Sequence, residues 1–300
     1  ATPVTVRNVQ DARGVDAGRM HACAVTERGA VFCWGSNDWG QLGTSNRRNP
    51  SGNLAARVVG LRGAVGVTTG SDHSCAITSR GQVQCWGKND VGQLGDGTRE
   101  LRSRPTRAQG LTATSVAAGG HSTCAVRADG VVACWGDLTG TERPVAIDGF
   151  HAPAVDVAVG DESACARLSD GRVVCWGSGA HGTLGPSTMA ASDIPVPVDG
   201  LPPAVSIRMG ATRACAVDAQ GLTWCWGSRQ ALAQDSANPN RQAGLGLVLD
   251  TVANRDATCS ALQSGGVCCW GVNRSGLLGV GFQPFASPAR EVEWPIPMQW

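Results

Sequence analysis

The chain has 300 residues and a formal net charge of +1; only 16% of its residues are charged, whereas 41 are glycine and 15 are proline. The near-neutral charge excludes a global field that would recruit nucleic acid or an anionic membrane, and no apolar run is long enough to span a bilayer. The glycine and proline content indicates many short strands joined by turns. The sequence begins Ala1-Thr2-Pro3 without an initiator methionine, so we expect that a signal peptide was removed or that the chain was trimmed.

Six copies of a repeat of roughly fifty residues run along the chain. In each copy a Cys-Trp-Gly triplet follows another cysteine by ten residues, and a glycine stands four residues before the triplet. Five copies have a further glycine five residues before the first cysteine, and the sixth has Asn254 there. Asn is the residue after glycine that best tolerates a left-handed backbone, so we expect a positive φ at this place. The repeat hairpins lie near residues 18–43, 70–95, 119–136, 160–185, 210–227 and 254–279.

The spacing of the two cysteines predicts a β-hairpin in every copy. In the first copy Glu27-Arg28-Gly29 forms a three-residue loop whose third position favours a left-handed glycine. Cys23 and Cys33 then face each other in a non-hydrogen-bonded pair, within the span of a disulfide. Both faces of the hairpin are apolar, which suits a strand pair enclosed between neighbouring sheets.

Each copy also predicts two further strands. A segment from a proline to a valine and a following strand precede the hairpins, most clearly in 105–118, 144–159 and 195–209. A Gly-x-Leu-Gly turn follows the hairpin in the first, second, fourth and sixth copies. Four short strands per copy are the content of a propeller blade.

Thirteen cysteines are unusual for a cytosolic protein without a metal. Zinc sites use close pairs such as Cys-x-x-Cys, so pairs ten residues apart across hairpins favour disulfides. The thirteenth, Cys268, is predicted to be a buried thiol among apolar neighbours, with a reactive or intermolecular role as the alternative. The predicted disulfide cysteines are Cys23, Cys33, Cys75, Cys85, Cys124, Cys134, Cys165, Cys175, Cys215, Cys225, Cys259 and Cys269.

These elements predict an all-β protein: a single β-propeller domain over residues 1–300, with six four-stranded antiparallel blades and one hairpin disulfide per blade. Strand-like segments at both ends, 3–6 and 288–294, suggest that the termini close the ring and remove an exposed edge. One of the two segments does so, and the other extends a blade.

The repeats resemble the regulator-of-chromosome-condensation repeat family. The resemblance is carried by Gly70-Ser71-Asp72-His73-Ser74-Cys75-Ala76-Ile77, by Trp86-Gly87, and by 89–95, which ends in Gly-Gln-Leu-Gly. It implies a propeller that binds other proteins through one face or rim. Members include a guanine-nucleotide exchange factor, membrane-traffic regulators, ubiquitin-ligase modules and a secreted inhibitor of β-lactamase.

Two features depart from the family pattern. Its best-known members have seven blades, whereas the intervals between Cys-Trp sites here leave room for six. Regular cysteine pairs are absent from the nuclear and cytosolic members. The chain therefore resembles a cysteine-rich, bacterial-type secreted variant, located extracellularly, at the cell surface or in the periplasm.

No catalytic, cofactor or metal motif is present, so we predict a protein that is not an enzyme and has no cofactor or metal. His21 and His73 hold the same repeat position, and His121 is one residue out of step. A histidine at a repeated position is more often a structural hydrogen-bonding residue than a ligand. His151 and His181 fall in loops without another histidine or cysteine nearby.

The loops that depart from the repeat template are the expected binding regions. They are residues 44–54, 96–104, 186–193 and 228–243. The first two are basic, and Trp39 replaces the valine found at Val91, so it is a candidate exposed aromatic. The candidate partner-binding residues are Trp39, Arg47, Arg48, Arg99, Arg102, Arg104, Trp294 and Trp300.

The sequence therefore predicts a secreted or cell-surface, non-catalytic scaffold that recognises a protein through its loop face. A glycan is the alternative ligand, nucleic acid and a membrane span are not expected, and self-assembly stays open. Two other functions compete: a secreted enzyme inhibitor, which exposed aromatics on one face would favour, and an intracellular exchange-factor-like regulator, which requires reduced cysteines.

Overall fold

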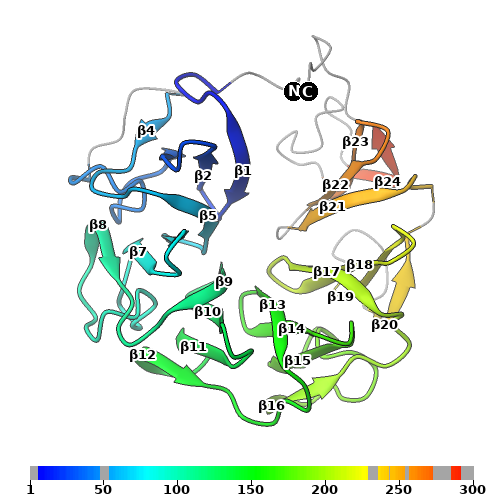
Figure 1. Cartoon of the computed structure of the whole chain (residues 1–300). Helices are drawn as coiled ribbons and strands as arrows, with labels where there is room; N and C mark the ends of the chain where they lie inside the picture. The colour runs from blue at the N-terminus through cyan, green and yellow to red at the C-terminus, as the bar shows by residue number, and fades with distance from the viewer. Residues whose placement is uncertain are drawn as a thin grey trace. The chain divides into compact units, whose positions relative to one another are not determined.

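The computed structural model describes residues 6–47, 54–228, 236–242, 244–253, 257–272 and 285–291. Its strands form six four-stranded sheets, each made from consecutive strands of the chain (Figure 1). Neighbouring strands within the sheets run antiparallel. Each sheet is a propeller blade, so the predicted all-β fold with six blades is confirmed.

One compact unit spans Val6–Glu162. It contains the first three blades and the strand β13 (Ala154–Val159). The first blade consists of β1 (Ala12–Ala17), β2 (His21–Thr26), β3 (Val31–Gly35) and β4 (Ala56–Arg57). The second consists of β5 (Ala64–Thr69), β6 (His73–Thr78), β7 (Val83–Gly87) and β8 (Arg102–Arg107). The third consists of β9 (Ala113–Gly119), β10 (Ser122–Arg127), β11 (Val132–Gly136) and β12 (Thr141–Ala146).

A second compact unit contains Ser163–Trp300. The fourth sheet has the order β13-β14-β15-β16, with β14 (Ser163–Leu168), β15 (Val173–Gly177) and β16 (Ser192–Pro197). The fifth consists of β17 (Ala204–Met209), β18 (Arg213–Asp218), β19 (Thr223–Gly227) and β20 (Ser236–Arg241). The sixth consists of β21 (Val248–Ala253), β22 (Ala257–Leu262), β23 (Val267–Val272) and β24 (Phe285–Glu291).

The hairpin at the centre of each blade has the predicted register. Cys23 lies opposite Cys33, and the loop closes with Thr26 N donating to the carbonyl of Ala30 at 2.9 Å. Gly29 at the third loop position has a φ of 72°. All six predicted cysteine pairs form disulfides across their hairpins. The ten-residue spacing thus fixes both the turn and the covalent bond.

The proline segments that precede the hairpins divide between two blades. Each supplies the outer, fourth strand of one sheet and then the first strand of the next, as β8 and β9 do. The outer strands β8, β12, β16 and β20 all have proline as their fourth residue, at Pro105, Pro144, Pro195 and Pro239. Proline lacks an N–H and is confined to sheet edges and bulges, so the sequence marks these strands as edges.

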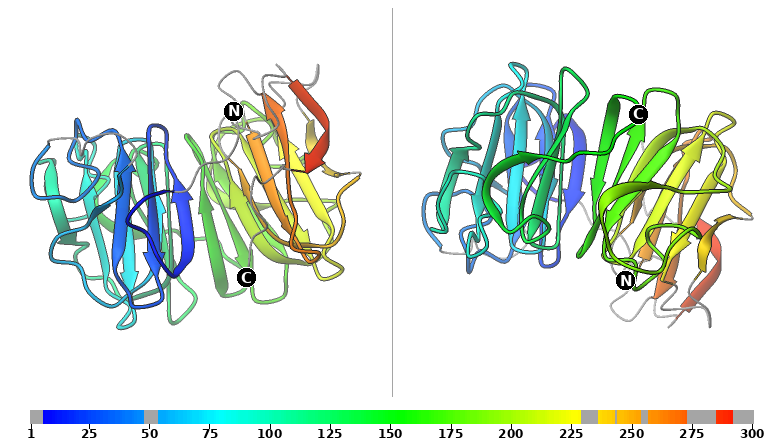
Figure 2. Two further views of the ribbon diagram at one scale, coloured as in Figure 1. Left: turned by 90° about the horizontal axis from the view of Figure 1, so that it is seen from above. Right: turned by 90° about the horizontal axis from the view of Figure 1, so that it is seen from below.

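The core of the unit Val6–Glu162 lies between consecutive blades, which stack face to face (Figure 2). The disulfide Cys23–Cys33 is fully buried and packs in one cluster with Trp86 of the second blade. In the same way, Cys75–Cys85 packs in one cluster with Trp135 of the third. The prediction that both hairpin faces are enclosed by neighbouring blades is confirmed for the second blade, whose Trp86 packs on the first blade and whose disulfide packs on the third. In the unit Ser163–Trp300, Cys215 and Cys225 pack in the same manner with Trp270.

The Gly-x-Leu-Gly turns of the first, second and fourth blades contact the tryptophan of the next blade. The carbonyl of Gln41 accepts a hydrogen bond from Trp86 Nε1 at 2.8 Å, and that of Gln93 accepts one from Trp135 Nε1 at 2.9 Å. The carbonyl of Thr183 likewise accepts a hydrogen bond from Trp226 Nε1 at 2.9 Å. The leucines of these turns, Leu42, Leu94 and Leu184, are completely buried.

The expectation of a left-handed backbone five residues before the first cysteine is wrong. Gly18, Gly70 and Gly119 do not have a positive φ. A Cβ at Gly70 would instead meet the ring of His73 and, at 3.0 Å, the carbonyl oxygen of Gly120 in the next blade. Glycine is required there because the His73 ring and the next blade both approach closely, and not because of the backbone conformation.

The remaining sequence predictions concern the ends of the chain and Cys268. Pro288 lies on β24, the fourth strand of the sixth sheet, while 292–294 and 3–5 fall outside the described residues, so closure by the termini stays a prediction. Cys268 is buried in a cluster with Val217, Val248 and Leu262, as its neighbours predicted. In the part of the chain that the structure describes, no helix is long and apolar enough to cross a membrane.

Candidate protein-interaction surface

The loop after β3 holds Trp39 in a fixed backbone position. The N–H of Trp39 donates to Gln41 Oε1 at 2.9 Å, and the N–H of Leu42 donates to Asn37 Oδ1 at 3.1 Å. Asn37 and Gln41 are both fully buried, and Gly40, with a φ of 75°, packs against Ser103 of β8. A loop fixed by buried side chains loses little conformational entropy on binding.

The indole of Trp39 projects from this loop with 41% of its surface exposed. The Lys88 ammonium lies 5.1 Å from the centre of the ring, a distance at which a cation is attracted by the aromatic face. Lys88 also forms a salt bridge of 3.0 Å with Asp90. Burial opposes ionisation of Asp90, but hydrogen bonds from Lys88 and Gln93 outweigh it and lower its pKa. The first and second blades therefore build one aromatic and charged surface together.

Sequence reasoning did not find Lys88 or Met20 as members of this surface. Lys88 is the single lysine of the chain and follows Trp-Gly, where the first copy has Ser36. Met20 is 63% exposed, and its carbonyl accepts from Ser36 N at 2.9 Å, so it lies at the same end of the blade as the Trp39 loop. The departure of each residue from its repeat equivalents was the available signal.

Two of the predicted arginines, Arg99 and Arg102, have acidic partners. Arg99 forms a 2.7 Å salt bridge with Glu142 and lowers the pKa of that carboxyl group. Arg102 binds Asp96 at 2.8 Å and Glu100 at 3.3 Å. Their charges are thus balanced by carboxylates of the loop that precedes β8 and of β12.

The other predicted arginines and tryptophans have different positions. Arg47 and Arg104 are exposed, and neither forms a salt bridge within the described residues. Arg48, Trp294 and Trp300 lie outside the described residues. Of the predicted partner-binding residues, Trp39 is thus the one that the structure shows in a rigid, exposed setting.

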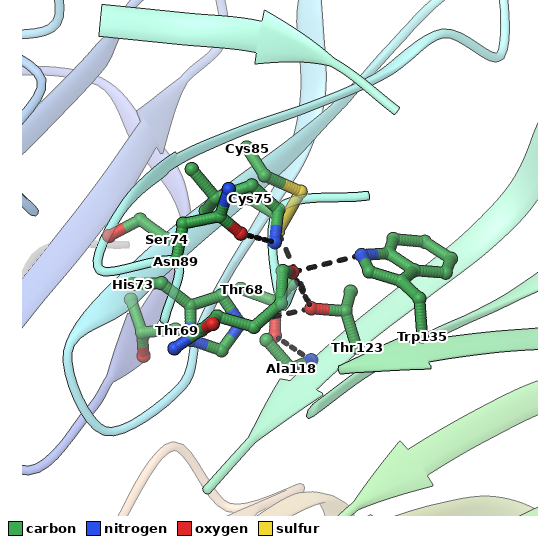
Figure 3. Close-up of a disulfide and its surroundings, with 12 residues drawn as sticks. Thr68, Thr69, His73, Ser74, Cys75, Cys85, Asn89, Ala118, Thr123 and Trp135 are labelled. Atoms are coloured by element: carbon green, nitrogen blue, oxygen red, sulfur yellow. Dashed lines mark hydrogen bonds between the residues drawn. A yellow bond between two sulfur atoms is a disulfide. The ribbon is translucent and has the colours of Figure 1, made fainter. Parts of the chain in front are cut away.

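The histidines at the repeated position have a structural environment. His21 Nε2 lies 2.8 Å from Ser74 Oγ, and His73 Nε2 lies 2.9 Å from Thr123 Oγ1 (Figure 3). Burial lowers the pKa of His21 to about 4 and that of His73 to about 3. Both side chains are therefore neutral near pH 7 and connect consecutive blades.

The two histidines stand two residues before the first cysteine of their copies. The type of residue at this position corresponds to the residue that the next copy has just before its own first cysteine. Where the next copy has a hydroxyl there, the position holds a long polar side chain that contacts it. His21 contacts Ser74 in this way, and Arg213 Nη1 lies 3.4 Å from Thr258 Oγ1. Where the next copy has alanine before its first cysteine, this position is a serine. Ser122 of the third copy thus corresponds to Ala164 of the fourth, and Ser163 of the fourth copy to Ala214 of the fifth. Within the described part, no group of three His, Cys, Asp or Glu side chains could hold a metal ion.

Comparison with known proteins identifies the repeat. Residues 28–77, 80–126 and 170–217 match the model of the Regulator of chromosome condensation (RCC1) repeat. Residues 12–41, 64–93 and 154–183 match a second model of the same repeat. Together the matches extend over residues 12–126 and 154–217, which is more than half of the chain.

Individual relatives agree with this match. A stretch of 114 residues is 37% identical to the human E3 ubiquitin-protein ligase HERC2; it covers 36% of this chain but only 2% of that protein. The structure of human WBSCR16 is similar with a TM-score of 0.76 and 26% identity, over 83% of this chain and 71% of the other.

Yeast RCC1 (Prp20), in its complex with Kap60, has the same fold with a TM-score of 0.78 and 20% identity, over 94% of this chain and 73% of the other. The matched motifs are the ones that build the hairpins, the Gly-x-Leu-Gly turns and the tryptophan contacts between blades. The chain belongs to the Regulator of chromosome condensation (RCC1) repeat family.

Proposed function

We propose that this protein is a secreted or cell-surface, non-catalytic binding protein that recognises another protein through the surface around Trp39 and Met20. The observation that carries the proposal is the buried disulfide in every blade. Such bonds persist in oxidising compartments and are rare where glutathione and thioredoxin keep thiols reduced. A bacterial envelope or extracellular location fits this chemistry.

The shape and chemistry of the Trp39 loop support recognition of a protein. Tryptophan is favoured at binding hot spots because it offers a large rigid contact area. Trp39 presents that area from a backbone that is already fixed, and Lys88 adds a charge beside it. The fold has a precedent for protein binding, because yeast RCC1 (Prp20) was crystallised with Kap60.

The inhibitor alternative receives less support. It would be favoured by several exposed aromatic side chains on one face. Among the described residues, Trp39 is the single aromatic residue with a largely exposed side chain. General protein recognition is therefore the better proposal.

The compartment is tested by alkylating the thiols of protein isolated from its native source, before and after reduction, followed by mass spectrometry. We expect the twelve hairpin cysteines to be labelled only after reduction. Labelling of all twelve without reduction would overturn the extracellular proposal and favour the intracellular regulator.

The binding surface is tested with a photo-crosslinking amino acid placed at Trp39 in the full chain and used on the native cells. Met189, which is 57% exposed in the other compact unit, is the matched control position. A discrete protein adduct at position 39 and none at 189 is expected. Equal adducts at both positions, or none at 39, would argue against recognition at this loop.

A further inference from the structure

Four arginines on the outer strands of the first three blades are exposed and form no salt bridge within the described residues. We call them the outer-strand arginines. They are Arg57 of β4, Arg104 and Arg107 of β8, and Arg143 of β12. A guanidinium group without a carboxylate contact is available to an anionic ligand.

The nearby acidic side chains are already engaged. Glu142 accepts from Arg99 at 2.7 Å, and Asp96 accepts from Arg102 at 2.8 Å. The guanidinium of Arg143 lies against Gly97, which follows Asp96 in the loop before β8. A Cβ at Gly97 would come within 2.8 Å of Arg143 Nε. The outer strands β8 and β12 therefore carry an excess of positive charge that the nearby carboxylates do not balance.

The outer-strand arginines recur at equivalent places in consecutive blades. Arg57 lies opposite Phe32, and Arg107 lies opposite Gln84 at the same position of the next blade. Arg104 and Arg143 each stand directly before the proline of their strand. In the other compact unit, β16 contains no arginine and has Asp193, whereas β20 has Arg241 opposite Trp224, at the place that Arg57 and Arg107 hold. The charge is thus repeated from blade to blade, which suits an extended ligand with repeated anionic groups.

The side chains around these arginines indicate which polyanion fits. β8 and β12 contain no aromatic residue, so they offer no platform on which the bases of a single-stranded nucleic acid could stack. A protein partner would need an apolar centre, but the exposed hydrophobic residue of these strands is Val145 alone. The planar fork of arginine matches carboxylate and sulfate groups in two-point contacts.

We propose that the outer-strand arginines bind an acidic polysaccharide through its carboxylate or sulfate groups. The inference rests on the proposed function in one respect, because such polymers are encountered outside the cell. The strand β8 adjoins the Trp39 loop, because Ser103 lies against Gly40, and the variants tested below leave the Trp39 loop unchanged.

The test uses the full chain with heparin as the sulfated probe and alginate as the carboxylated probe, measured by calorimetry at low ionic strength. The variant R57Q/R104Q/R107Q/R143Q removes four exposed ionic contacts, and we expect binding to weaken by about tenfold or more. Wild-type binding should also weaken steeply with added salt. Because all four side chains are exposed, the thermal midpoint should change little.

The control is R28Q/R80Q/R127Q/R172Q, which removes the same charge from exposed positions at the hairpin ends of four blades, where Arg127 and Arg172 form salt bridges with Asp129 and Asp170. It should bind both probes within about twofold of the wild type. Equal weakening in both variants would show an effect of net charge and overturn the site. Absence of binding to both probes, or tighter binding of polyglutamate or DNA, would overturn the polysaccharide proposal. None of these outcomes depends on the cysteine labelling, so failure of the compartment proposal is recognised separately.

Discussion

His73 of β6 and Thr123 of β10 are joined by a hydrogen bond of 2.9 Å between the imidazole Nε2 and the hydroxyl (Figure 3). The hydroxyl of Thr123 donates its single proton to the carbonyl of Gln93, 2.9 Å away. It therefore accepts from the histidine, which fixes the neutral imidazole with its proton on Nε2. The same arrangement connects His21 to Ser74 and the carbonyl of Gln41.

Thr123→Ala should destabilise the protein by about 1–3 kcal/mol, because the buried donor of His73 loses its acceptor. The double variant H73S/T123A restores the combination found naturally in Ser122 and Ala164. Its cost should be smaller than the sum of the two single changes by about 1 kcal/mol. Urea unfolding of the wild type, T123A, H73S and H73S/T123A measures the coupling free energy. Simple additivity of the changes would show that the two residues act independently.

Stability should fall as the pH is lowered from 6.5 towards 4. The pKa values of His21 and His73 are lowered to about 4 and about 3, so the unfolded chain binds these protons first. The contribution of the two neutral histidines is complete above the unfolded pKa of about 6.5 and is lost below it, with a size on the order of a few kcal/mol. Thermal midpoints between pH 3.5 and 7.5 measure it.

The comparison variant for the pH series is H21Q/H73Q, which should show a flatter dependence. Burial raises the pKa of Asp16, and this change acts in the opposite direction because the folded state then binds the extra proton. The difference between the two proteins is therefore the informative quantity. Parallel curves would assign the acid sensitivity to other groups.

Removing one hairpin disulfide with C75A/C85A should lower the free energy of unfolding by up to about 3 kcal/mol in the chain-entropy model. Both sulfur atoms are fully buried between the second and third blades, so loss of packing adds to this effect. Denaturant unfolding of the variant and of the wild type gives the change. An unaltered midpoint would mean that blade packing alone holds the hairpin.

Gly70→Ala should be far more damaging than Gly110→Ala. A side chain at Gly70 would collide with His73 and approach the carbonyl of Gly120, whereas nothing lies within 4 Å of a Cβ at Gly110. Gly110 has a φ of 66°, so alanine there costs only the backbone strain, about 1–2 kcal/mol. Similar midpoints for the two variants would contradict the close packing of His73 and Gly120 around Gly70.

The covalent and repetitive parts of the structure could be predicted from the sequence. The ten residues between Cys23 and Cys33 determine the hairpin loop, the register and the disulfide, because all three depend on local backbone geometry. The blade number follows from counting the copies. The role of Gly70 was misassigned because its constraint comes from the packed ring of His73 and from the carbonyl of Gly120, fifty residues later, and not from a left-handed backbone.

Side-chain partners between blades were beyond the sequence for a similar reason. Lys88 meets Trp39 only because the loop after β3 packs on the second blade. Arg102 has an acidic partner six residues away in Asp96, but a loop sequence alone does not distinguish a paired arginine from an exposed one. The exposure of Trp39 was predictable because it replaces the valine that the second copy has at Val91.

The prolines of the outer strands affect whether neighbouring copies of the protein can pair through their sheet edges. Ala108 N donates inward to the carbonyl of Val83, so the alternation along β8 turns the nitrogen of residue 105 towards the open edge. An incoming strand from a neighbouring molecule would find no proton at Pro105, and Pro144, Pro195 and Pro239 interrupt the other edges at the same place. Crowded copies on a surface would thus remain separate molecules and would not merge into a continuous sheet.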